Sequence, residues 1–318
     1  MNNTSDAHRL DGRVALVSGG ARGVGLAISQ TLAAQGAKVV VADAGGAIDG
    51  SDTDPAIAQA VATELGDNAV AFTESIADAG AAQAAVALAN EAFGGLDILV
   101  NNAAILRDGF IFKSDPTDFD AVLKTNLAGA WYLTNAATPL MRQNAKDDRG
   151  GEPYDWGRVV NITSTAGFYG NFGQSSYASA KSGMLGLMRT TAMDLARAGI
   201  TCNAVAPFAA TRVTDTIVPA NDEQATYKER ALKVSPNHVA MVVAWLCSPA
   251  GQTINGQLFG VRGREVFLFS QPRPVATVVR DDADWDVGAL SAAAAENFTP
   301  LYTDLKTDLE VFNTDPKV

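Results

Sequence analysis

The chain has 318 residues, of which 47% are hydrophobic and 19% are charged, and its mean hydropathy is +0.05. This is the composition of a globular protein, with enough length for one large domain or two small ones. The formal net charge of −11 argues against a nucleic-acid partner, because phosphate recognition normally requires a basic surface.

Short apolar runs alternate with longer helical stretches from Arg13 onward. Several short runs are apolar throughout, which is typical of parallel strands covered on both faces. The longer stretches, such as 23–36 and 81–95, end in glycine, a common residue after a helix. The alternation predicts an α/β fold, a single doubly wound Rossmann domain with a seven-stranded parallel sheet. The expected strands are 14–18, 38–43, 68–72, 96–102, 157–164, 199–207 and 256–261.

The alternation ends near Gln271. Residues 10–270 are therefore expected to form the domain, and residues 271–318 a C-terminal extension too short and polar for a core of its own. Within the extension, "GALSAAAAENF" predicts one helix. The rest is expected to lie on the surface or to cover a partner subunit.

Side chains that bind metals or form disulfides are scarce. The two cysteines, Cys202 and Cys247, lie in apolar runs, and His8 and His238 are far apart in the sequence, so no metal site is expected. The N-terminus shows no apolar signal segment, no apolar run has membrane-spanning length, and "DPKV" is not a peroxisomal signal. We therefore expect a cytoplasmic enzyme that does not bind membranes.

A glycine-rich turn follows the first expected strand. In "SGGARGVG", Gly19, Gly23 and Gly25 form a G-x3-G-x-G pattern at a strand-to-helix junction. Such glycines let backbone N–H groups approach a pyrophosphate at the helix N-terminus. Asp43, at the end of the second expected strand, has the spacing of a carboxylate that binds ribose hydroxyls. The pattern predicts a dinucleotide site that prefers NAD, because Asp43 repels a 2′-phosphate; Arg22 alone argues for NADP.

A second motif lies in "SSYASAKSG", which places Tyr177 and Lys181 one helical turn apart and on the same face. Ser164 precedes them at the end of the fifth expected strand, and Asn126 lies in an earlier helical segment. Oxidation of an alcohol requires its hydroxyl to lose a proton. A tyrosine can accept that proton if a nearby ammonium and a cationic nicotinamide lower its pKa from about 10.

Together these motifs resemble the short-chain dehydrogenase/reductase family over residues 10–265, with "NNAA" at 101–104 where the family usually has N-N-A-G. The resemblance implies a catalytic tetrad of Asn126, Ser164, Tyr177 and Lys181. In that family the lysine also holds the nicotinamide ribose, the serine binds the substrate oxygen, and the asparagine supports a water that carries protons away. The implied cofactor contacts are Gly19, Arg22, Gly23, Val24, Gly25, Asp43, Ser75, Ile76, Asn102, Ala103, Tyr177, Lys181 and Pro207.

Longer stretches narrow the resemblance. "NNAAILRDGFIF", "GFYGNFGQSSYASAKSGMLGL" and "CNAVAPFAATRVT" are similar to the (3R)-hydroxyacyl-CoA dehydrogenase part of peroxisomal multifunctional β-oxidation enzymes and its stand-alone bacterial relatives. This implies interconversion of (3R)-3-hydroxyacyl-CoA and 3-oxoacyl-CoA with NAD. Two alternatives stay open: an NAD-dependent dehydrogenase of hydroxysteroids or other secondary alcohols, and an NAD-binding regulator without catalytic activity.

Polar residues 208–236 follow the sixth expected strand, where the family has a mobile substrate lid. The family also pairs helices like those near 122–142 and 177–198 between subunits, which implies a homodimer or homotetramer. The candidate substrate contacts are Phe168, Phe172, Phe208 and Arg212. Because CoA carries several phosphate charges, an acidic protein needs a local basic patch, for which the candidates are Arg107, Arg212, Lys228, Arg230 and Lys233.

Overall fold

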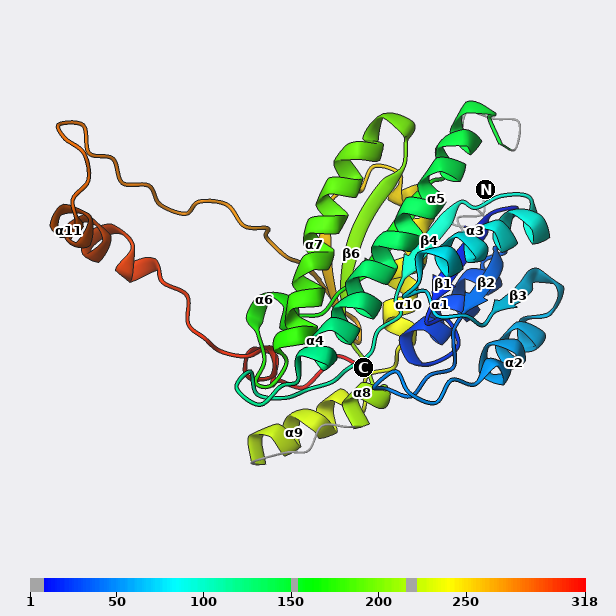
Figure 1. The fold of residues 1–318 in the computed structure, drawn as a ribbon, viewed down its shortest axis with the longest axis horizontal. Helices are drawn as coiled ribbons and strands as arrows, with labels where there is room; N and C mark the ends of the chain where they lie inside the picture. The colour runs from blue at the N-terminus through cyan, green and yellow to red at the C-terminus, as the bar shows by residue number, and fades with distance from the viewer. Residues whose placement is uncertain (1–8, 150–153, 216–221) are drawn as a thin grey trace.

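The computed structural model describes residues 9–149, 154–215 and 222–318. Its centre is one eight-stranded sheet in the order β3-β2-β1-β4-β5-β6-β7-β8, with helices on both faces (Figure 1). All neighbouring strands are parallel except β7 and β8. The strands are β1 (Val14–Ser18), β2 (Lys38–Ala42), β3 (Ala69–Phe72), β4 (Ile98–Asn101), β5 (Arg158–Ile162), β6 (Thr201–Phe208), β7 (Leu258–Arg262) and β8 (Glu265–Leu268). The predicted doubly wound Rossmann class is confirmed.

The seven predicted parallel strands are all present, and the sheet has one strand more than predicted, because β7 continues into a hairpin. Arg262 pairs with Glu265 across a tight turn, and Gly263 adopts a φ of +59° there, which suits glycine. β8 therefore runs back antiparallel at the edge of the sheet. Its residues alternate between partly buried and exposed, so the strand lacks the wholly apolar pattern by which the other strands were recognised.

Side chains that alternate along each central strand supply two cores, one for each face of the sheet. On β1, Ala15 and Val17 pack into the core under helices α1 (Gly23–Ala34), α2 (Pro55–Leu65) and α10 (Asn237–Cys247). Val14 and Leu16 pack into the opposite core. That second core lies under α3 (Ala79–Phe93), α5 (Gly129–Lys146) and α7 (Ser175–Leu195). Because both faces are covered, the carboxyl ends of the parallel strands and their loops are left to form a site.

Shorter helices lie in the loops at that edge. They are α4 (Pro116–Leu123), a π-helical turn (Lys124–Ala128), α6 (Ala166–Tyr169), α8 (Arg212–Asp215) and α9 (Asp222–Ala231). Within the described residues no helix combines the length and apolarity needed to cross a bilayer. On the helices predicted to pair between subunits, Trp131 and Met193 are 50% and 67% exposed; the pairing itself stays a prediction.

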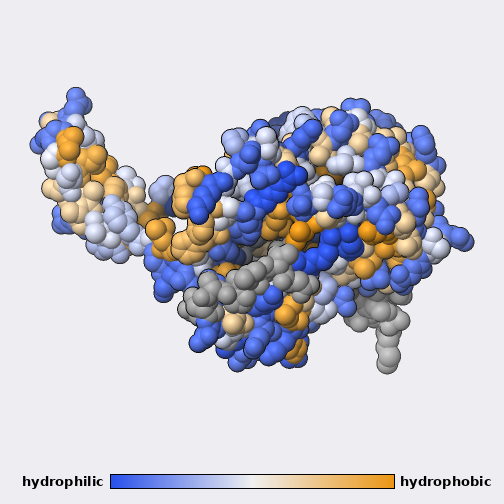
Figure 2. Space-filling view, turned by 60° about the horizontal axis from the view of Figure 1, so that its bottom comes forward, coloured by the Kyte–Doolittle hydropathy of each residue, from blue (hydrophilic) through white to orange (hydrophobic). Residues whose placement is uncertain are grey.

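The C-terminal extension leaves the domain and then comes back to it. An arm, residues 270–306, projects outward and carries α11 (Val287–Asn297), the helix predicted from sequence (Figures 1 and 2). None of the residues of α11 is buried. A returning segment, residues 307–318, begins with α12 (Asp308–Val311) and lies beside the carboxyl end of the sheet. The two parts of the extension thus have opposite environments.

Several contacts hold the returning segment to the domain. Arg262, almost fully buried, donates from Nη1 to the Phe312 carbonyl at 2.6 Å and from Nη2 to Thr314 Oγ1 at 2.9 Å. The backbone N–H of Arg264 donates to the Lys317 carbonyl at 2.6 Å. The Phe312 ring packs against Phe208 at the end of β6, with ring centroids 4.7 Å apart. The chain end is therefore built into the domain, next to its functional edge.

Candidate active site

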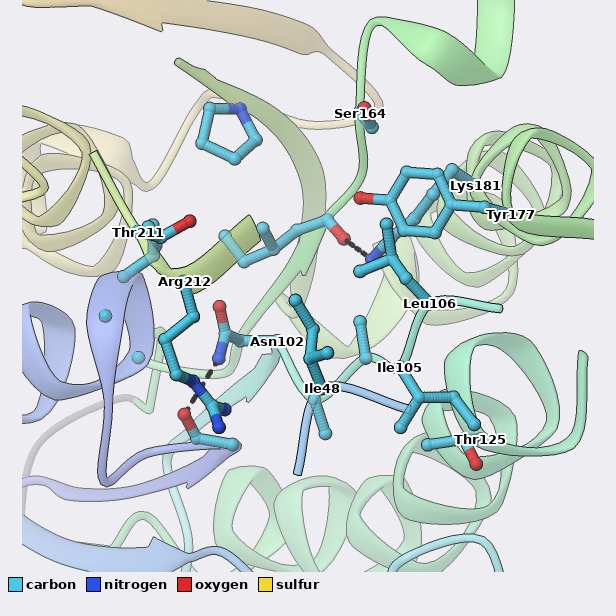
Figure 3. Close-up of a pocket in the computed structure, with 18 of the residues that line it drawn as sticks. Ile48, Asn102, Ile105, Leu106, Thr125, Ser164, Tyr177, Lys181, Thr211 and Arg212 are labelled. Carbon is cyan, nitrogen blue, oxygen red and sulfur yellow. Dashed lines mark hydrogen bonds between the residues drawn. The ribbon is translucent and has the colours of Figure 1, made fainter. Parts of the chain in front are cut away.

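A cavity of about 780 Å³ opens at the carboxyl ends of the strands. Its walls come from the loops after strands β1 to β6, from α7 and α9, and from the returning segment. Figure 3 shows Tyr177, Lys181 and Ser164 on one side of this cavity, and Thr211 and Arg212 on the other. Every residue of the predicted cofactor set and three of the predicted tetrad, Ser164, Tyr177 and Lys181, line it.

Tyr177 and Lys181 lie in the first two turns of α7. Lys181 is buried, and its Nζ donates to the Ile162 carbonyl at 2.8 Å, while its own carbonyl accepts from Thr163 Oγ1 at 2.7 Å. These two bonds fix α7 against the end of β5, which carries Ser164 into the same cavity. The Nζ lies 5.7 Å from the centre of the Tyr177 ring. The phenol, the ammonium and the serine hydroxyl therefore share one small volume.

The electrostatics of this group differ from the sequence-based expectation. Burial raises the pKa of Tyr177 to about 12, the hydrogen bond with Ser164 opposes the rise, and the charges of Asp308 and Asp108 add to it. Burial also lowers the pKa of Lys181 to about 8. We expected a lowered tyrosine pKa, and the chain by itself does not provide one. The ammonium of Lys181 alone is insufficient against the desolvation of the phenol.

Asn126 stabilises the loop after β4. It lies in the π-helical turn between α4 and α5, and only 1% of it is exposed. Its Oδ1 accepts from the Ile105 N–H at 2.8 Å, and its Nδ2 donates to the Ile105 carbonyl at 2.9 Å. Single π-helical turns of this kind occur often at functional sites. The side chain thus fixes Ile105, a lining residue of the cavity; its predicted role in supporting a water stays a prediction.

The glycine loop has the geometry that a dinucleotide requires. Gly19 and Gly23 adopt φ values of +61° and +55°, which side chains disfavour. A Cβ on Gly25 would lie 1.9 Å from the Gly19 carbonyl oxygen, so this close turn needs glycine there. Because the loop leads directly into α1, its backbone N–H groups lie at a helix N-terminus, where a pyrophosphate binds favourably. The residues present therefore fit a dinucleotide cofactor.

Asp43 organises the turn that faces the ribose position. Its Oδ1 accepts from the Gly45 N–H at 2.8 Å, and its Oδ2 from the Ala21 N–H at 3.2 Å. Arg22 donates from Nη2 to the Gly46 carbonyl at 2.7 Å and lies 3.4 Å from Asp43 Oδ1. The charge of Arg22 is thus partly compensated by the carboxylate that a 2′-phosphate would have to approach.

Arg212, predicted to contact substrate, lies at the nucleotide end of the cavity. Its Nη1 is 3.4 Å from the Gly46 carbonyl, the same oxygen that accepts from Arg22. Burial and the charge of Arg22 lower the pKa of Arg212, and Asp43 opposes that effect. The guanidinium groups of Arg22 and Arg212 therefore lie close together at this end of the cavity.

The aromatic candidates separate into two groups. Phe172 and Phe208 line the cavity; Phe172 is 77% exposed at its mouth and Phe208 is buried. Phe168 is not part of the described lining, and its ring packs instead on Phe269 with centroids 4.9 Å apart. In the predicted lid, Tyr227 of α9 lines the cavity; residues 216–221 of that lid lie outside the described residues.

Of the five candidate cations, of which two or three were expected to matter, two line the cavity. Arg107 lines the cavity and pairs with Asp118 at 2.9 Å. Arg230 instead holds the returning segment, where it pairs with Asp315 at 2.9 Å. Lys228 and Lys233 are not in the described lining. Arg107 and Arg212 are therefore the two predicted cations that face the cavity within the described residues.

Sequence reasoning missed the returning segment as a wall of the site. Asp308 and Leu309 line the cavity, and Asp308 accepts from Thr165 across 143 positions of sequence. The one available signal was the capping box of Thr307 and Glu310, a T-x-x-E pattern that marks a helix start. That pattern indicates where α12 begins, but it carries no information about what α12 packs against.

Comparisons with known proteins agree with this geometry. The family model described as short chain dehydrogenase matches residues 13–224. The hydroxyacyl-CoA dehydrogenase ChsB1 of Mycobacterium tuberculosis is 39% identical over 297 residues, which cover 93% of this chain and 90% of that protein. The peroxisomal multifunctional enzyme type 2 of Mus musculus is 34% identical over 275 residues, 86% of this chain. The chain spans about a third of the mouse enzyme, 34% of its length.

Solved structures show the same similarity. A crystal structure of a short chain dehydrogenase from Mycobacterium avium has a TM-score of 0.75 and 34% identity, and the match covers 90% of this chain and 94% of that one. The 3-ketoacyl-(acyl-carrier-protein) reductase of Brucella melitensis, complexed with NADH, has a TM-score of 0.70 and 28% identity over 80% of this chain and 98% of that one.

Proposed function

This chain belongs to the short-chain dehydrogenase family, as its motifs suggested, and on that premise we propose that it oxidises (3R)-3-hydroxyacyl-CoA to 3-oxoacyl-CoA with NAD⁺. Membership makes it an oxidoreductase that acts on CH–OH groups. The observation that carries the proposal is the convergence of Tyr177, Lys181 and Ser164 in one cavity that also contains the glycine loop and Asp43.

The roles of the chain's residues follow from their positions. Ser164 donates a hydrogen bond to the carbinol oxygen, and Tyr177 accepts the proton of that hydroxyl. Lys181 Nζ donates to the Ile162 carbonyl and keeps two further N–H groups for the ribose hydroxyls. When bound, NAD⁺ supplies the hydride acceptor and a positive ring charge. Tyr177 needs such a charge, because its pKa in the chain alone is about 12.

Preference for NAD over NADP rests on Asp43. Its carboxylate lies at the end of β2 and lines the cavity, where it can accept from ribose hydroxyls and repels a 2′-phosphate. Arg22 could offset that repulsion, but it already donates to Gly46 and lies near Asp43. NADH in the related Brucella reductase supports a nicotinamide cofactor.

The acyl-CoA substrate is supported by relatives and by the cavity. The Mycobacterium relative is named a hydroxyacyl-CoA dehydrogenase. Arg107 and Arg212 supply positive charge at the cavity, and Phe172 and Phe208 supply apolar surface for an acyl chain. The same apolar surface suits a hydroxysteroid or another secondary alcohol, which is the second candidate.

The test measures NADH formation by absorbance with a (3R)-3-hydroxyacyl-CoA, its S enantiomer and a 17-hydroxysteroid, each at low and high salt. We expect the R thioester to exceed the S form by about a hundredfold in kcat/KM. We also expect its KM to rise with salt, because phosphates contact Arg side chains. A steroid preferred by more than about tenfold, about 1.4 kcal/mol, selects the second candidate. If none of these alcohols is turned over, the result contradicts an enzymatic role.

A further inference from the structure

The returning segment places a carboxyl group in the active-site cavity. Asp308 is the first residue of α12, it is 6% exposed, and it lines the same cavity as Ser164 and Tyr177. The side chains of Thr307 and Glu310 form the capping box of this helix. The helix start is therefore stabilised without Asp308, whose carboxyl faces the site instead.

The two oxygens of Asp308 have different environments. Oδ2 accepts from Thr165 Oγ1 at 2.6 Å. Oδ1 is buried and has no hydrogen-bond partner among the described residues. A buried polar atom without a partner is costly, by about 1–3 kcal/mol, and such atoms in folded proteins are usually satisfied by a ligand, an ion or water. The orphaned oxygen therefore indicates a partner that binds in the cavity.

The surroundings make the neutral form of Asp308 easier to reach than in an exposed aspartate. Burial raises the pKa of Asp308, while the hydrogen bond from Thr165 and the nearby backbone N–H groups of Leu309 and Asp308 oppose that rise. The titratable groups that feel its charge are Tyr177 on α7 and Tyr227 on α9, and in both a negative Asp308 raises the pKa further. A neutral Asp308 removes that obstacle to proton transfer at Tyr177, and its free O–H is a donor.

Asp308 is bonded to the residue that follows Ser164, and this neighbourhood points to one group of the proposed substrate. Thr165, its partner, directly follows Ser164, which holds the carbinol oxygen at C3. In a 3-hydroxyacyl thioester the next hydrogen-bond acceptor is the C1 carbonyl oxygen, two carbons away along the acyl chain. A simple secondary alcohol or a 17-hydroxysteroid has no acceptor at that place. The acid can therefore distinguish these substrate classes.

We propose that Asp308 is a substrate-binding residue, which donates a hydrogen bond from its Oδ1 hydroxyl to the carbonyl oxygen two carbons from the reacting carbinol. Thr165 holds the other oxygen and so orients the donor. This proposal rests on the function proposed above, since it names the part of the thioester that the site recognises. Under this proposal, helix α12 of the returning segment helps to determine substrate specificity.

The test compares kcat/KM for three alcohols of equal chain length: a 3-hydroxyacyl thioester, the corresponding β-hydroxy ketone and a secondary alcohol with no carbonyl. Asp308→Ala is expected to lower kcat/KM about tenfold for the first two, the loss of one hydrogen bond, and less than about twofold for the third. Asp308→Asn is expected to stay within about threefold of wild type on all three, because its amide N–H donates while its oxygen accepts from Thr165.

Two further variants separate recognition from docking of the returning segment. Asp304→Ala removes an exposed aspartate of the same extension, one that lies 3.7 Å from Lys306, and is expected to change nothing. Arg262→Ala removes the bonds to Phe312 and Thr314. Because it displaces the whole segment, Asp308 included, it is expected to lower kcat/KM on all three alcohols, with a further loss of about tenfold on the two that carry the carbonyl.

The outcomes are distinct. A loss in Asp308→Ala that is equal on all three alcohols, or no loss on any, overturns the assignment. If Asp308→Asn loses about tenfold on the thioester and the β-hydroxy ketone relative to wild type, the donor role is overturned. This comparison with wild type can be made even if the Ala variant does not fold. Wild-type oxidation of the β-hydroxy ketone but not of the thioester contradicts the proposed function alone, and the ketone then tests Asp308. Turnover of none of the three contradicts both.

Discussion

The nucleotide wall and the substrate wall of the cavity are built from different ranges of the sequence. The nucleotide wall comes from the first two βα units, where Gly19 and Asp43 follow consecutive strands. The substrate wall joins Thr165 and Asp308, which are 143 positions apart. The first wall follows from local turn geometry at strand ends. The second exists because Arg262 and Phe312 hold the chain end in place.

The same contrast divides the C-terminal extension itself. The returning segment is held by backbone and side-chain hydrogen bonds, and Asp308 within it is buried. The arm before it presents apolar residues such as Val275 and Leu305, which are 84% and 94% exposed. Length and composition do not separate these two parts. Tertiary contacts distinguish the returning segment from the arm. Variants in the nucleotide wall, the substrate wall and the arm should therefore differ widely in their effects on activity and stability.

The largest expected effect belongs to Tyr177→Phe. It removes the hydroxyl that accepts the proton and keeps the ring, so kcat should fall by about 10³-fold. The affinity for NADH, measured by fluorescence titration, should stay within about threefold, because the nucleotide wall is untouched. Turnover close to wild type would show that another group is the base.

The second-largest expected effect is a change in the stability of the protein when Lys181 is replaced. The pKa of this buried lysine is about 8 in the folded chain, below its ordinary value of 10.5. Between these two pH values the unfolded chain keeps a proton that the folded chain has lost. The charge therefore lowers stability below pH 8, and this penalty disappears as the pH rises toward 10.5. Lys181→Met should be inactive, yet more stable by about 1–2 kcal/mol at neutral pH.

Urea unfolding at a series of pH values measures this difference. The stability gap between Lys181→Met and wild type should shrink between pH 8 and 10.5. A gap that is independent of pH would mean that packing of the methionine, and not removal of a buried charge, is responsible.

A smaller effect is expected at the nucleotide wall itself. Asp43→Ala removes the repulsion of a 2′-phosphate and the acceptor for the ribose hydroxyls, so the ratio of kcat/KM for NAD over NADP should fall about tenfold. Steady-state kinetics with both cofactors checks it. Wild-type preference for NADP would show that Arg22 and Arg212 outweigh Asp43.

The smallest effect is expected on the arm. Leu290 of α11 is 43% exposed and none of α11 is buried, so Leu290→Ser should change the unfolding free energy of the single chain by less than about 0.5 kcal/mol. Thermal unfolding at low protein concentration measures it. A decrease above about 2 kcal/mol would mean that the arm packs against protein, and the contrast between the arm and the returning segment would then fail.

Most of the fold could be predicted from the sequence, because wholly apolar strands and glycine-terminated helices leave strong local patterns. The exception, β8, is short, alternating and at the edge, so its pattern is weak. The cofactor set could be proposed from similar local patterns, since its residues lie at or just after strand ends or in the first two turns of α1 and α7; their contact with the cofactor stays a prediction. The positions of Phe168 and Arg212 were harder to predict. Phe168 packs against Phe269 and is not in the described lining, and Arg212 lines the cavity at the end near Gly46.

The sequence by itself determined the Rossmann class, the glycine loop with Asp43, and the spacing of Tyr177 and Lys181, because each depends on residues within one or two turns or at adjacent strand ends. Tertiary structure decided the rest. Burial, which depends on the whole fold, raised the pKa of Tyr177 instead of lowering it. Contacts from Arg262, Arg264 and Thr165 brought the last turn of the chain, and with it Asp308, to the cavity. No periodicity encodes such contacts, because they join residues far apart in sequence that only the packed domain places together.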